Sequence, residues 1–357
     1  MLLVAQNAAR RVLAHRSFVV DALPTVTAVF LAYNRQAQLR ESLRRMRDES
    51  GYPAGLLDLV VVDNASTDDT VEMLEREYPD VTVVETGANL GAPGWNAGFR
   101  VARGEYVVIL DDDAYLPTGA LEAAVRAARE QDAGLVSFTV VSSEDERYRF
   151  NDQYITGLLS YWGCAALVSR AALDELGGYD PNIFIWGNEL EFTMRLLDRG
   201  YTHLYLPDVA AVHMKEPVEN PVWESRGVRH NCRHWGYVAG KLLRPRDAVL
   251  VASSLALWTV VEGVARDRTT LQGFLPVFGG FAAGLRNRAP MRPVVSSTYR
   301  RNFHTFGWPW RYWRTPADRW RAWRGEESVE LQRDRPRVAW FDERRRFYPE
   351  GRASLRL

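Results

Sequence analysis

Short apolar runs alternate with segments of helical periodicity along the first 215 residues. The runs contain four to eight mostly apolar and β-branched residues, and they span 25–32, 56–62, 81–84, 106–110, 135–141, 163–168 and 202–206. Runs of this length without polar alternation are typical of strands that are buried on both faces of a sheet. Between them, spacings such as Leu39, Leu43 and Met46 indicate amphipathic helices. The alternation predicts an α/β fold with a mostly parallel sheet flanked by helices.

The run at 106–110 leads directly into Asp111, Asp112 and Asp113. Three carboxylates at the end of a buried strand repel one another and lose solvation, and a divalent cation relieves both costs because hard cations take carboxylate oxygens as ligands. Residues two apart on an extended segment point the same way, so Asp111 and Asp113 share one side and Asp112 faces backbone groups on the other. The alternative is a solvated acidic turn leading to Pro117.

Other polar clusters also follow strands, at Tyr33-Asn34-Arg35 and at Asp63-Asn64. Open α/β sheets bind ligands at the carboxyl ends of their strands, so these clusters and the acidic triplet are expected at one edge. Asp63 can accept a hydrogen bond from a pyrimidine N–H. The alternative for Asp63-Asn64 is a turn or helix cap, which both residue types favour.

A second acidic cluster, Asn188-Glu189-Leu190-Glu191, begins a predicted helix at 188–198. We expect Asn188 to cap the helix and Glu191 to reach back in a capping box. Glu191 also precedes Arg195 by four residues and can pair with it. This interpretation leaves Glu189 without a local partner.

Charge divides the chain into two parts. Residues 1–225 contain 19 Lys and Arg against 34 Asp and Glu, a net of −15, whereas residues 226–357 contain 26 against 11, a net of +15. Eight of the twelve tryptophans lie in the basic part, which favours an anionic surface as partner. No nucleic-acid recognition motif accompanies the charge, so we expect an anionic membrane surface and no nucleic acid. The apolar segment 248–264 is interrupted by Ser253 and Glu262, which favours a buried or interfacial helix.

These patterns predict three regions: an N-terminal arm at 1–23, a catalytic domain at 24–225 and a helical, Arg- and Trp-rich region at 226–357. Two cysteines, Cys164 and Cys232, are too few for a disulfide framework. With no N-terminal signal peptide in the pattern, we expect a cytoplasmic protein held peripherally on the inner face of the cell membrane. The C-terminal region is also a candidate for homo-oligomer contacts.

The ordered motifs resemble the inverting family 2 glycosyltransferases with a GT-A, Rossmann-like fold. The resemblance covers about 24–215 and depends on segments 25–35, 60–70, 89–98, 111–113, 162–168 and 187–200 in that order. Within the family, the spacing and His213 look most like bacterial galactofuranosyl- and rhamnosyltransferases of cell-envelope polysaccharide synthesis. The resemblance implies transfer of a hexosyl group from a UDP- or dTDP-sugar to a hydroxyl of a glycan or lipid-linked acceptor.

The resemblance also implies roles for individual residues. Asp113, Asp111 and His213 would hold Mn²⁺ or Mg²⁺, with Asp111 reaching either the ribose or a metal-bound water; a loop histidine is the alternative for His213. Glu189 would be the general base, at a position where relatives often have Asp. The donor would contact Ala32, Tyr33, Asn34, Arg35, Asp63, Asn64, Asn89, Gly91, Gly94, Asn96, Asp111 and Asp112.

The loop 89–98 is rich in glycine, which would let its backbone approach the donor because glycine has no Cβ. Pro93 departs from the glycine-richer loop of some relatives and leaves the donor sugar open. The acceptor would contact Trp162, Gly163, Phe184, Trp186 and Asn188. For the three aromatic residues, ordinary core packing is an equal alternative.

Two other functions compete with glycosyl transfer. A sugar-nucleotide nucleotidyltransferase would need a Gly-rich, Lys-containing phosphate loop near the N-terminus, and 25–35 lacks that form. A non-catalytic glycan- or nucleotide-binding module would not need the acids Asp111, Asp113 and Glu189. The sequence leaves the acceptor and the linkage open.

Overall fold

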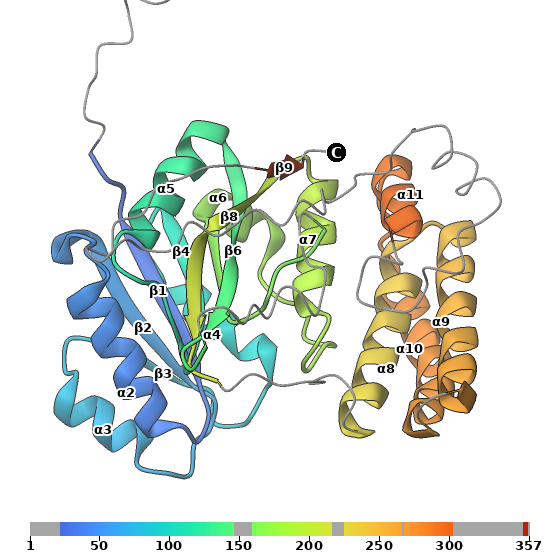
Figure 1. Ribbon diagram of the computed structural model, residues 1–357, viewed down its shortest axis with the longest axis horizontal. Helices are drawn as coiled ribbons and strands as arrows, with labels where there is room; N and C mark the ends of the chain where they lie inside the picture. Colours follow the sequence, from blue (N-terminus) through green and yellow to red (C-terminus); the bar gives the residue numbers. More distant parts are fainter. Residues whose placement is uncertain (1–21, 146–158, 216–224, 266–267, 303–352, 356–357) are drawn as a thin grey trace, which may run out of the picture.

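The computed structural model describes residues 22–145, 159–215, 225–265, 268–302 and 353–355. A sheet flanked by helices and a bundle of C-terminal helices stand side by side (Figure 1). The predicted arm lies outside the described residues except for its last two positions, 22 and 23.

The sheet has the strand order β3-β2-β1-β4-β7-β6-β8-β5. Its parallel half consists of β1 (Val26–Ala32), β2 (Leu57–Asp63), β3 (Thr82–Glu85) and β4 (Tyr106–Asp111). The other half consists of β7 (Ala165–Ser169), β6 (Ala133–Ser142), β8 (Thr202–His213) and β5 (Ala114–Tyr115). In this half β7 runs antiparallel to both β4 and β6, while β6 and β8 are parallel.

The seven predicted strands are all present, with bounds that differ by a few residues, but the sheet is more mixed than predicted because β7 is inserted antiparallel. The last strand is also longer than the segment 202–206. It continues to His213 through a register shift in which Leu206 pairs with Phe138 and Ala210 with Thr139. Pro207, which has no backbone N–H for the ladder, lies in the shifted part, and its carbonyl accepts from Thr139 Oγ1 at 2.7 Å.

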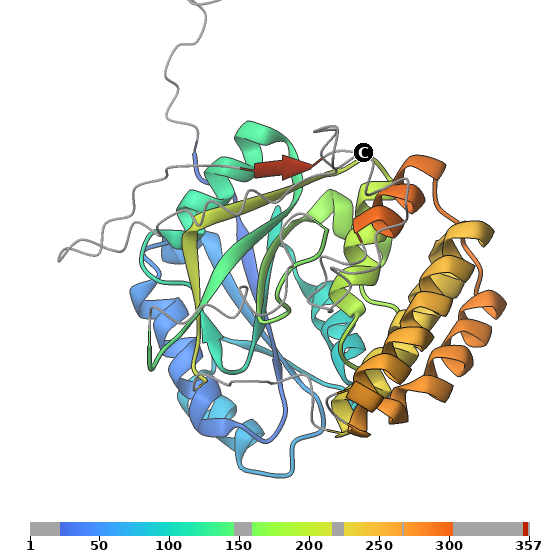
Figure 2. The same ribbon diagram turned by 45° about the vertical axis from the view of Figure 1, so that its right-hand side comes forward.

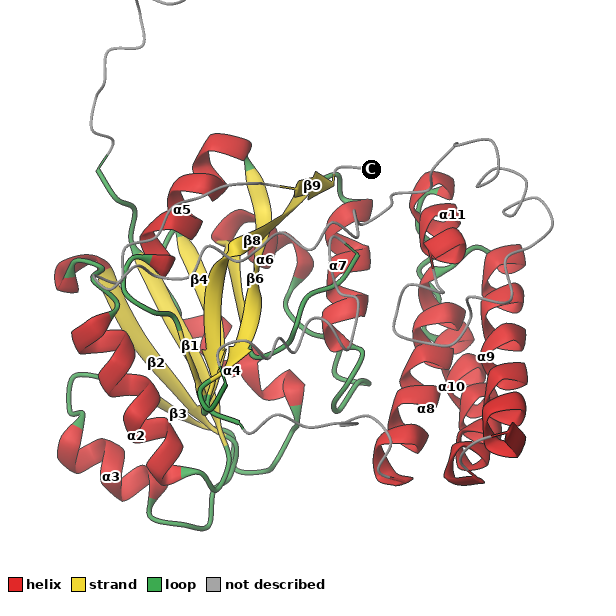
Figure 3. Cartoon of the chain, viewed as in Figure 1, coloured by secondary structure: helices red, strands yellow, loops and turns green. Residues whose placement is uncertain are grey.

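Helices cover both faces of the sheet (Figure 3). They are α2 (Gln36–Arg44), extended by the π-helical turn η1 (Arg45–Glu49), α3 (Thr70–Glu77), α4 (Trp95–Val101), α5 (Ala120–Gln131), α6 (Arg170–Leu176) and α7 (Asn188–Asp198). Short 3-10 turns are η2 (Ala54–Leu56) and η3 (Ala92–Gly94). Alternate residues of β4 enter two different cores, Val107 and Ile109 one and Val108 and Leu110 the other. This confirms that the strand is buried on both faces.

The C-terminal region is helical as predicted, with α8 (Ser225–Leu242), α9 (Pro245–Ala265), the 3-10 turn η5 (Arg268–Gly273), α10 (Phe274–Arg286) and α11 (Pro293–Asn302). Helices α8 and α10 pack closely through glycines: a Cβ on Gly280 would lie 1.8 Å from the Arg233 carbonyl oxygen, and one on Gly236 2.2 Å from that of Val277. A short strand that the sequence did not predict, β9 (Ala353–Leu355), pairs antiparallel with the start of β8. Most of the C-terminal tryptophans lie outside the described residues.

Two further features concern the predicted boundary at 225/226. One hydrophobic cluster extends without a break from Val29 and Val107 in the sheet to Leu255 and Val295 in the C-terminal helices. Within the described residues, one helical stretch, Pro245–Val264, is long and apolar enough to cross a membrane by length and composition, with a mean hydropathy of 1.5. Within the protein, 44% of this apolar stretch is buried.

Candidate active site

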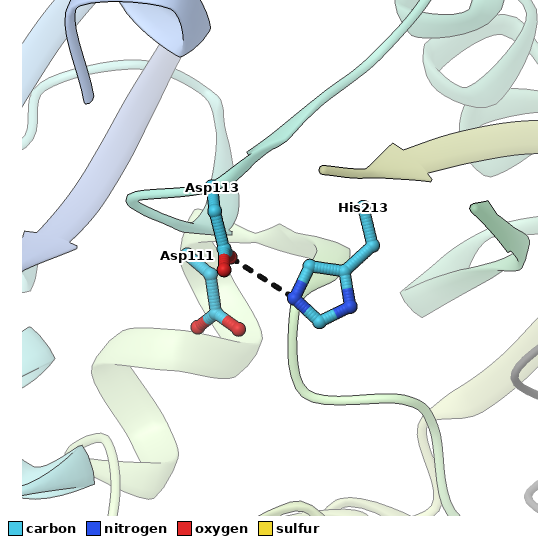
Figure 4. A group of neighbouring side chains, drawn as sticks. All are labelled: Asp111, Asp113 and His213. Atoms are coloured by element: carbon cyan, nitrogen blue, oxygen red, sulfur yellow. Dashed lines mark ion pairs between the residues drawn. The ribbon is translucent and has the colours of Figure 1, made fainter. Parts of the chain in front are cut away.

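Asp111, Asp113 and His213 come together at the carboxyl end of β4. Asp111 is the last residue of this strand, and the pairing of Ala114 in β5 with His213 in β8 aligns the histidine with the chain that leaves β4. One ligand atom from each of the three side chains lies within 4.8 Å of the others (Figure 4). The Nε2 atom of His213 is 3.0 Å from Oδ1 of Asp113.

The chemistry of these donors fits a divalent cation. Two carboxylates and an imidazole suit Mg²⁺ or Mn²⁺, which prefer oxygen ligands and accept imidazole. Neighbouring ligands at about 2.1 Å from an octahedral ion lie about 3.0 Å apart, and the Asp113–His213 separation matches that spacing. The predicted three residues therefore stand in an arrangement that can hold such an ion.

The surroundings shift the pKa values of the three carboxylates in different directions. Burial, together with the charge of the neighbouring Asp113, raises the pKa of Asp111 to about 7. Burial and Asp113 also raise the pKa of Asp112 to about 7. Burial opposes ionisation of Asp113 as well, but the hydrogen bond from His213 and the charge of Arg35 keep its pKa below its usual value. A cation at this cluster would relieve the repulsion among all three.

Arg35 joins the acidic cluster. Its guanidinium pairs with Asp113 and lies 3.3 Å from Oδ1 of Asp112. The Tyr33 N–H donates to Oδ2 of Asp112 at 3.1 Å, as expected for an acid that faces backbone groups. Arg35, predicted as a wall of the base pocket, thus points at the triplet.

Asp63 and Asn34 hold the turns beside the predicted base pocket. Asp63 ends β2 opposite Ala32, is buried, and accepts the Ser66 N–H at 3.1 Å. Asn34 has a positive φ of 55°, and its side-chain oxygen accepts the Thr67 N–H at 2.7 Å. The turn-forming alternative for Asp63 is therefore realised in its contact with Ser66.

The loop before α4 is fixed by asparagine side chains. Asn64 accepts the Leu90 N–H at 2.9 Å and donates to Asn89 at 3.0 Å. Asn96 bonds both the N–H and the carbonyl of Tyr179, each at 2.8 Å. These amides position the loop relative to the sheet and to the segment before α7.

Two glycines of this loop, Gly91 and Gly94, lie close to other parts of the protein. A Cβ on Gly91 would lie 2.1 Å from the Phe184 carbonyl oxygen, and one on Gly94 would lie 2.7 Å from Leu31. The Ala92 N–H also donates to that carbonyl of Phe184 at 2.7 Å. Close packing against the protein therefore requires glycine at these two positions, whereas their contact with a donor stays a prediction.

Glu189 lies in the first turn of α7 with its carboxylate against Gly163. A Cβ on Gly163 would lie 2.1 Å from Oε1 of Glu189, so only glycine leaves the space that this carboxylate fills. Burial raises the pKa of Glu189, although hydrogen bonds, including one from Gly187, act in the opposite direction. A partly desolvated carboxylate of raised pKa has the properties of a general base.

Glu191 is fully buried and belongs to an ion network. Its carboxylate oxygens lie 2.8 and 2.7 Å from nitrogen atoms of Arg195, and Oε1 is 2.8 Å from Nζ of Lys241. Lys241 also pairs with Asp180 at 2.6 Å. The predicted Glu191–Arg195 pair is confirmed.

The predicted capping box is wrong. Gly187, with a φ of 109°, is the N-cap, so Asn188 is the first helical residue and not the cap, although the helix spans 188–198 as predicted. Glu189, which the sequence left without a partner, accepts the Gly187 N–H at 3.3 Å. The positive φ of Gly187 explains the difference because the capping prediction assumed an asparagine cap.

Two of the three predicted acceptor aromatics are not core residues. Phe184 is 43% exposed and Trp186 is 38% exposed, while Trp162 packs partly buried against the core and Asn188 is buried. The core alternative thus fits Trp162 better than the other two.

Helix α8 supports the loop that carries Phe184 and Trp186. His234 Nδ1 donates to the carbonyl of Ile185 at 2.6 Å, and the ring of His230 meets that of Trp186 edge-on at 6.2 Å between centroids. Sequence reasoning missed His230, His234 and Lys241 because they lie outside every recognised motif. The only signal was the four-residue spacing of the two histidines in a helical segment.

Residues 27–186 match the family model described as glycosyl transferase family 2. Among curated proteins, the chain is 23% identical over 244 residues to the N-acetylglucosaminyl-diphospho-decaprenol L-rhamnosyltransferase of Mycobacterium tuberculosis, covering 55% of this chain and 77% of that protein. It is 24% identical over 214 residues to glycosyltransferase AglE of Haloferax volcanii, covering 56% and 70%. It is 30% identical over 101 residues to the poly(ribitol-phosphate) beta-glucosyltransferase of Bacillus spizizenii, covering 27% of this chain but only 16% of that longer protein.

Two solved structures share the fold. The mannosyltransferase PcManGT of Pyrobaculum calidifontis, in complex with GDP-Man and Mn²⁺, has a TM-score of 0.51 at 23% identity, over 80% of this chain and 95% of that one. Residues 1–349 of S. aureus TarS, in complex with UDP-GlcNAc, have a TM-score of 0.53 at 17% identity, over 78% and 86%. The predicted GT-A fold is confirmed.

Proposed function

We propose that this chain, which carries a glycosyl transferase family 2 domain at residues 27–186, transfers a sugar from a nucleoside-diphosphate sugar to an acceptor hydroxyl. The transfer inverts the configuration at the anomeric carbon. Asp111, Asp113 and His213 would hold Mn²⁺ or Mg²⁺. When bound, the cation would offset the charge that develops on the departing nucleoside diphosphate.

The protein's own part is proton transfer and positioning. Glu189 accepts the proton of the acceptor hydroxyl as its oxygen forms the new bond to the anomeric carbon and the bond to the diphosphate breaks. The raised pKa of Glu189 suits this role because it brings the carboxylate closer to the operating pH. Exposed Phe184 and Trp186 would supply aromatic faces for the acceptor sugar.

A link between the base and the acidic cluster carries this proposal. Gly163 contacts the carboxylate of Glu189, and the carbonyl of the next residue, Cys164, accepts the Asp111 N–H at 3.1 Å. Burial raises the pKa of the Cys164 thiol, and the charges of Asp111, Asp113 and Glu189 all add to the shift. The consecutive residues Gly163 and Cys164 therefore lie between the proposed base, Glu189, and the proposed cation site at Asp111.

The relatives support a class of substrate. Their names include a rhamnosyltransferase acting on a decaprenol-linked sugar and a glucosyltransferase acting on poly(ribitol-phosphate). We propose a UDP- or dTDP-sugar as donor and, as acceptor, a glycan or lipid-linked intermediate of cell-envelope polysaccharide synthesis. A cytoplasmic chain at the inner face of the membrane would meet such an acceptor.

The test is release of nucleoside diphosphate from a panel of UDP- and dTDP-sugars, with and without Mn²⁺, for the wild type and Asp113→Ala. We expect slow metal-dependent release in the wild type and none in the variant, whose melting temperature should remain close to that of the wild type. Release of pyrophosphate from sugar phosphate and nucleoside triphosphate would instead indicate a nucleotidyltransferase. Tight nucleotide binding without turnover would indicate a binding module.

A further inference from the structure

The outer faces of α9 and α10 are apolar along most of their length. On α9 the exposed hydrophobic residues are Val249, Leu250, Leu257, Val260, Val261 and Val264. At 3.6 residues per turn they fall within an arc of about 120°, in which the exposed polar residues of the helix are Arg246, in its first turn, and Ser253. Val264 of α9 is 78% exposed, and Leu275, at the start of α10, is 76% exposed.

Helix α10 repeats the pattern. Its exposed face contains Leu275, Phe278, Ala282 and Leu285, and it ends at Arg286. The two helices belong to the bundle that lies on the side of the molecule away from β1–β3 (Figure 2). We call the exposed residues of both helices the bundle stripes. Helices that pack only within a soluble protein usually present polar side chains to solvent, so the stripes indicate a partner.

Cations stand at one end of the stripes. The Arg288 guanidinium donates to the carbonyls of Gly240 and Leu243, which brings the end of α10 beside the start of α9. Arg244, Arg246 and Arg286 are exposed at this end, and none of them forms an ion pair with another described residue.

Acidic side chains do not balance these cations. Between 244 and 302 the described acids are Asp247, which is buried and pairs with Arg300 at 2.8 Å, and the partly buried Glu262. The described surface of this segment therefore combines apolar stripes with cations, and its one partly exposed acid, Glu262, lies outside the arc of the α9 stripe.

We infer that the bundle stripes dock on the headgroup region of an anionic lipid bilayer. A helix with an aliphatic face and arginines beside it gains from apolar burial and from attraction to anionic headgroups. A second copy of this chain is a poorer occupant, because a two-fold interface would set the surface against itself. Arg244, Arg246 and Arg286 would then meet no fully exposed acid among the described residues of this surface. The inference does not depend on the proposed sugar transfer.

The experiment is co-sedimentation of the full chain with vesicles of phosphatidylcholine containing phosphatidylglycerol, at low salt and without any donor. We expect Val261→Glu and Leu275→Glu each to weaken binding at least about tenfold, because each sets a charge in an apolar face. The matched control is Val101→Glu, an equally exposed valine on α4 (40% against 45% for Val261), which should bind as the wild type does.

Charge is tested in the same way. Arg246→Glu should weaken binding to anionic vesicles about tenfold, whereas Arg103→Glu, at an exposed position outside the bundle, should not. Unchanged binding in both stripe variants, or equal binding to vesicles of phosphatidylcholine alone, would overturn the inference. Failure of the wild type to bind anionic vesicles would also overturn it. If the wild type instead forms a dimer that Val261→Glu dissociates, the stripes belong to an interface with a second copy. Because no donor is present, a failed transfer assay leaves this result unaffected.

Discussion

At the scale of single residues, Glu189 and Glu191 show how two acids of one helical turn acquire different functions. Successive residues of a helix are about 100° apart, so these two point in nearly opposite directions. Glu191 faces Arg195 and Lys241 and is fully buried, whereas Glu189 faces Gly163 and the segment that leads to the acidic cluster. Arg195 and Lys241 compensate the charge of Glu191, which indicates a structural role. The charge of Glu189 is compensated less completely, so this carboxylate is able to accept a proton.

We predict that Glu189→Gln lowers turnover by about 10²–10⁴-fold, the usual contribution of a general base. The amide keeps the shape of the carboxylate but cannot take the proton, so donor affinity should change little. Steady-state kinetics together with nucleotide titration would measure both quantities.

Glu191→Gln is the matched control, since it removes the same charge two residues away. It should lower the melting temperature, because Arg195 and Lys241 lose a buried anionic partner, and it should leave turnover of the folded fraction near that of the wild type. An inactive, well-folded Glu191 variant beside an active Glu189 variant would reverse the assignment.

The raised pKa of Glu189 predicts the acidic limb of the pH profile. The base works only when ionised, so activity falls as the pH drops through its folded-state pKa, which burial moves above the value of a free glutamate. We expect the acidic limb of the kcat/KM profile of the wild type to lie above about pH 4.3. The pH profile of the residual activity of Glu189→Gln should lack this limb. A limb at the same pH in that variant would assign it to another group.

At the scale of elements, the sequence was informative wherever burial controls the pattern. The strand β4 and the helix α7 are within a residue of prediction because continuous apolar runs and periodic spacing report local burial. The antiparallel insertion of β7 and the pairing of β9 with β8 depend on chain segments far apart in sequence, which no local pattern encodes. The capping of α7 was predicted wrongly because Gly187, with a φ of 109°, takes the N-cap position that the sequence pattern assigned to Asn188.

The site followed the same division. Asp111, Asp113 and His213 could be grouped from the sequence because they lie at or just after strand ends: Asp111 ends β4, Asp113 lies in the turn that follows it, and His213 ends β8. The reason for Gly91 was not, since its neighbour Phe184 lies more than 90 residues away in the chain. His234 was missed because its function is to hold a backbone loop, which requires no recognisable motif.

The contact between α7 and α8 supports a prediction about stability. Lys241 lies between Asp180 and Glu191, and Lys241→Met would leave two carboxylates facing each other without the cation. Breaking a buried ion pair from one side costs on the order of 3 kcal/mol. Chemical denaturation would measure the loss, with Arg126→Met as control, because its exposed pair with Glu122 should contribute less than about 1 kcal/mol.

The same network sets the pH dependence of that loss. Asp180 has a pKa of about 2 because, although burial opposes ionisation, the hydrogen bond from Lys241 favours it. A depressed folded-state pKa stabilises the protein above the unfolded value and loses that effect as the pH falls through the folded value. The difference between the wild type and Lys241→Met should therefore shrink between about pH 4 and pH 2. A difference that is constant over this range would contradict the assigned pairing.

At the scale of the whole molecule, the C-terminal helices are joined to the sheet domain by more than the chain connection at 225. The hydrophobic cluster is continuous across that point. Backbone contacts reinforce it, since the Tyr299 hydroxyl donates to the Leu159 carbonyl at 2.7 Å and the Arg292 N–H donates to Asp198 at 2.7 Å. The sequence predicted separate regions from charge and composition, which report the surface and not the core.

We therefore predict that the protein unfolds in one cooperative transition. Domains that share a core lose their packing together, whereas domains joined by a small polar interface melt separately. Calorimetry should show one endotherm. The loss of the helical circular dichroism signal should coincide with the change in tryptophan fluorescence. In Lys241→Met the single transition should move to lower temperature without splitting, because Leu255 and Val295 still anchor the bundle in the shared cluster. Two resolved transitions in the wild type, with the helices α8–α11 melting first, would show that the shared apolar cluster does not make the two regions unfold together.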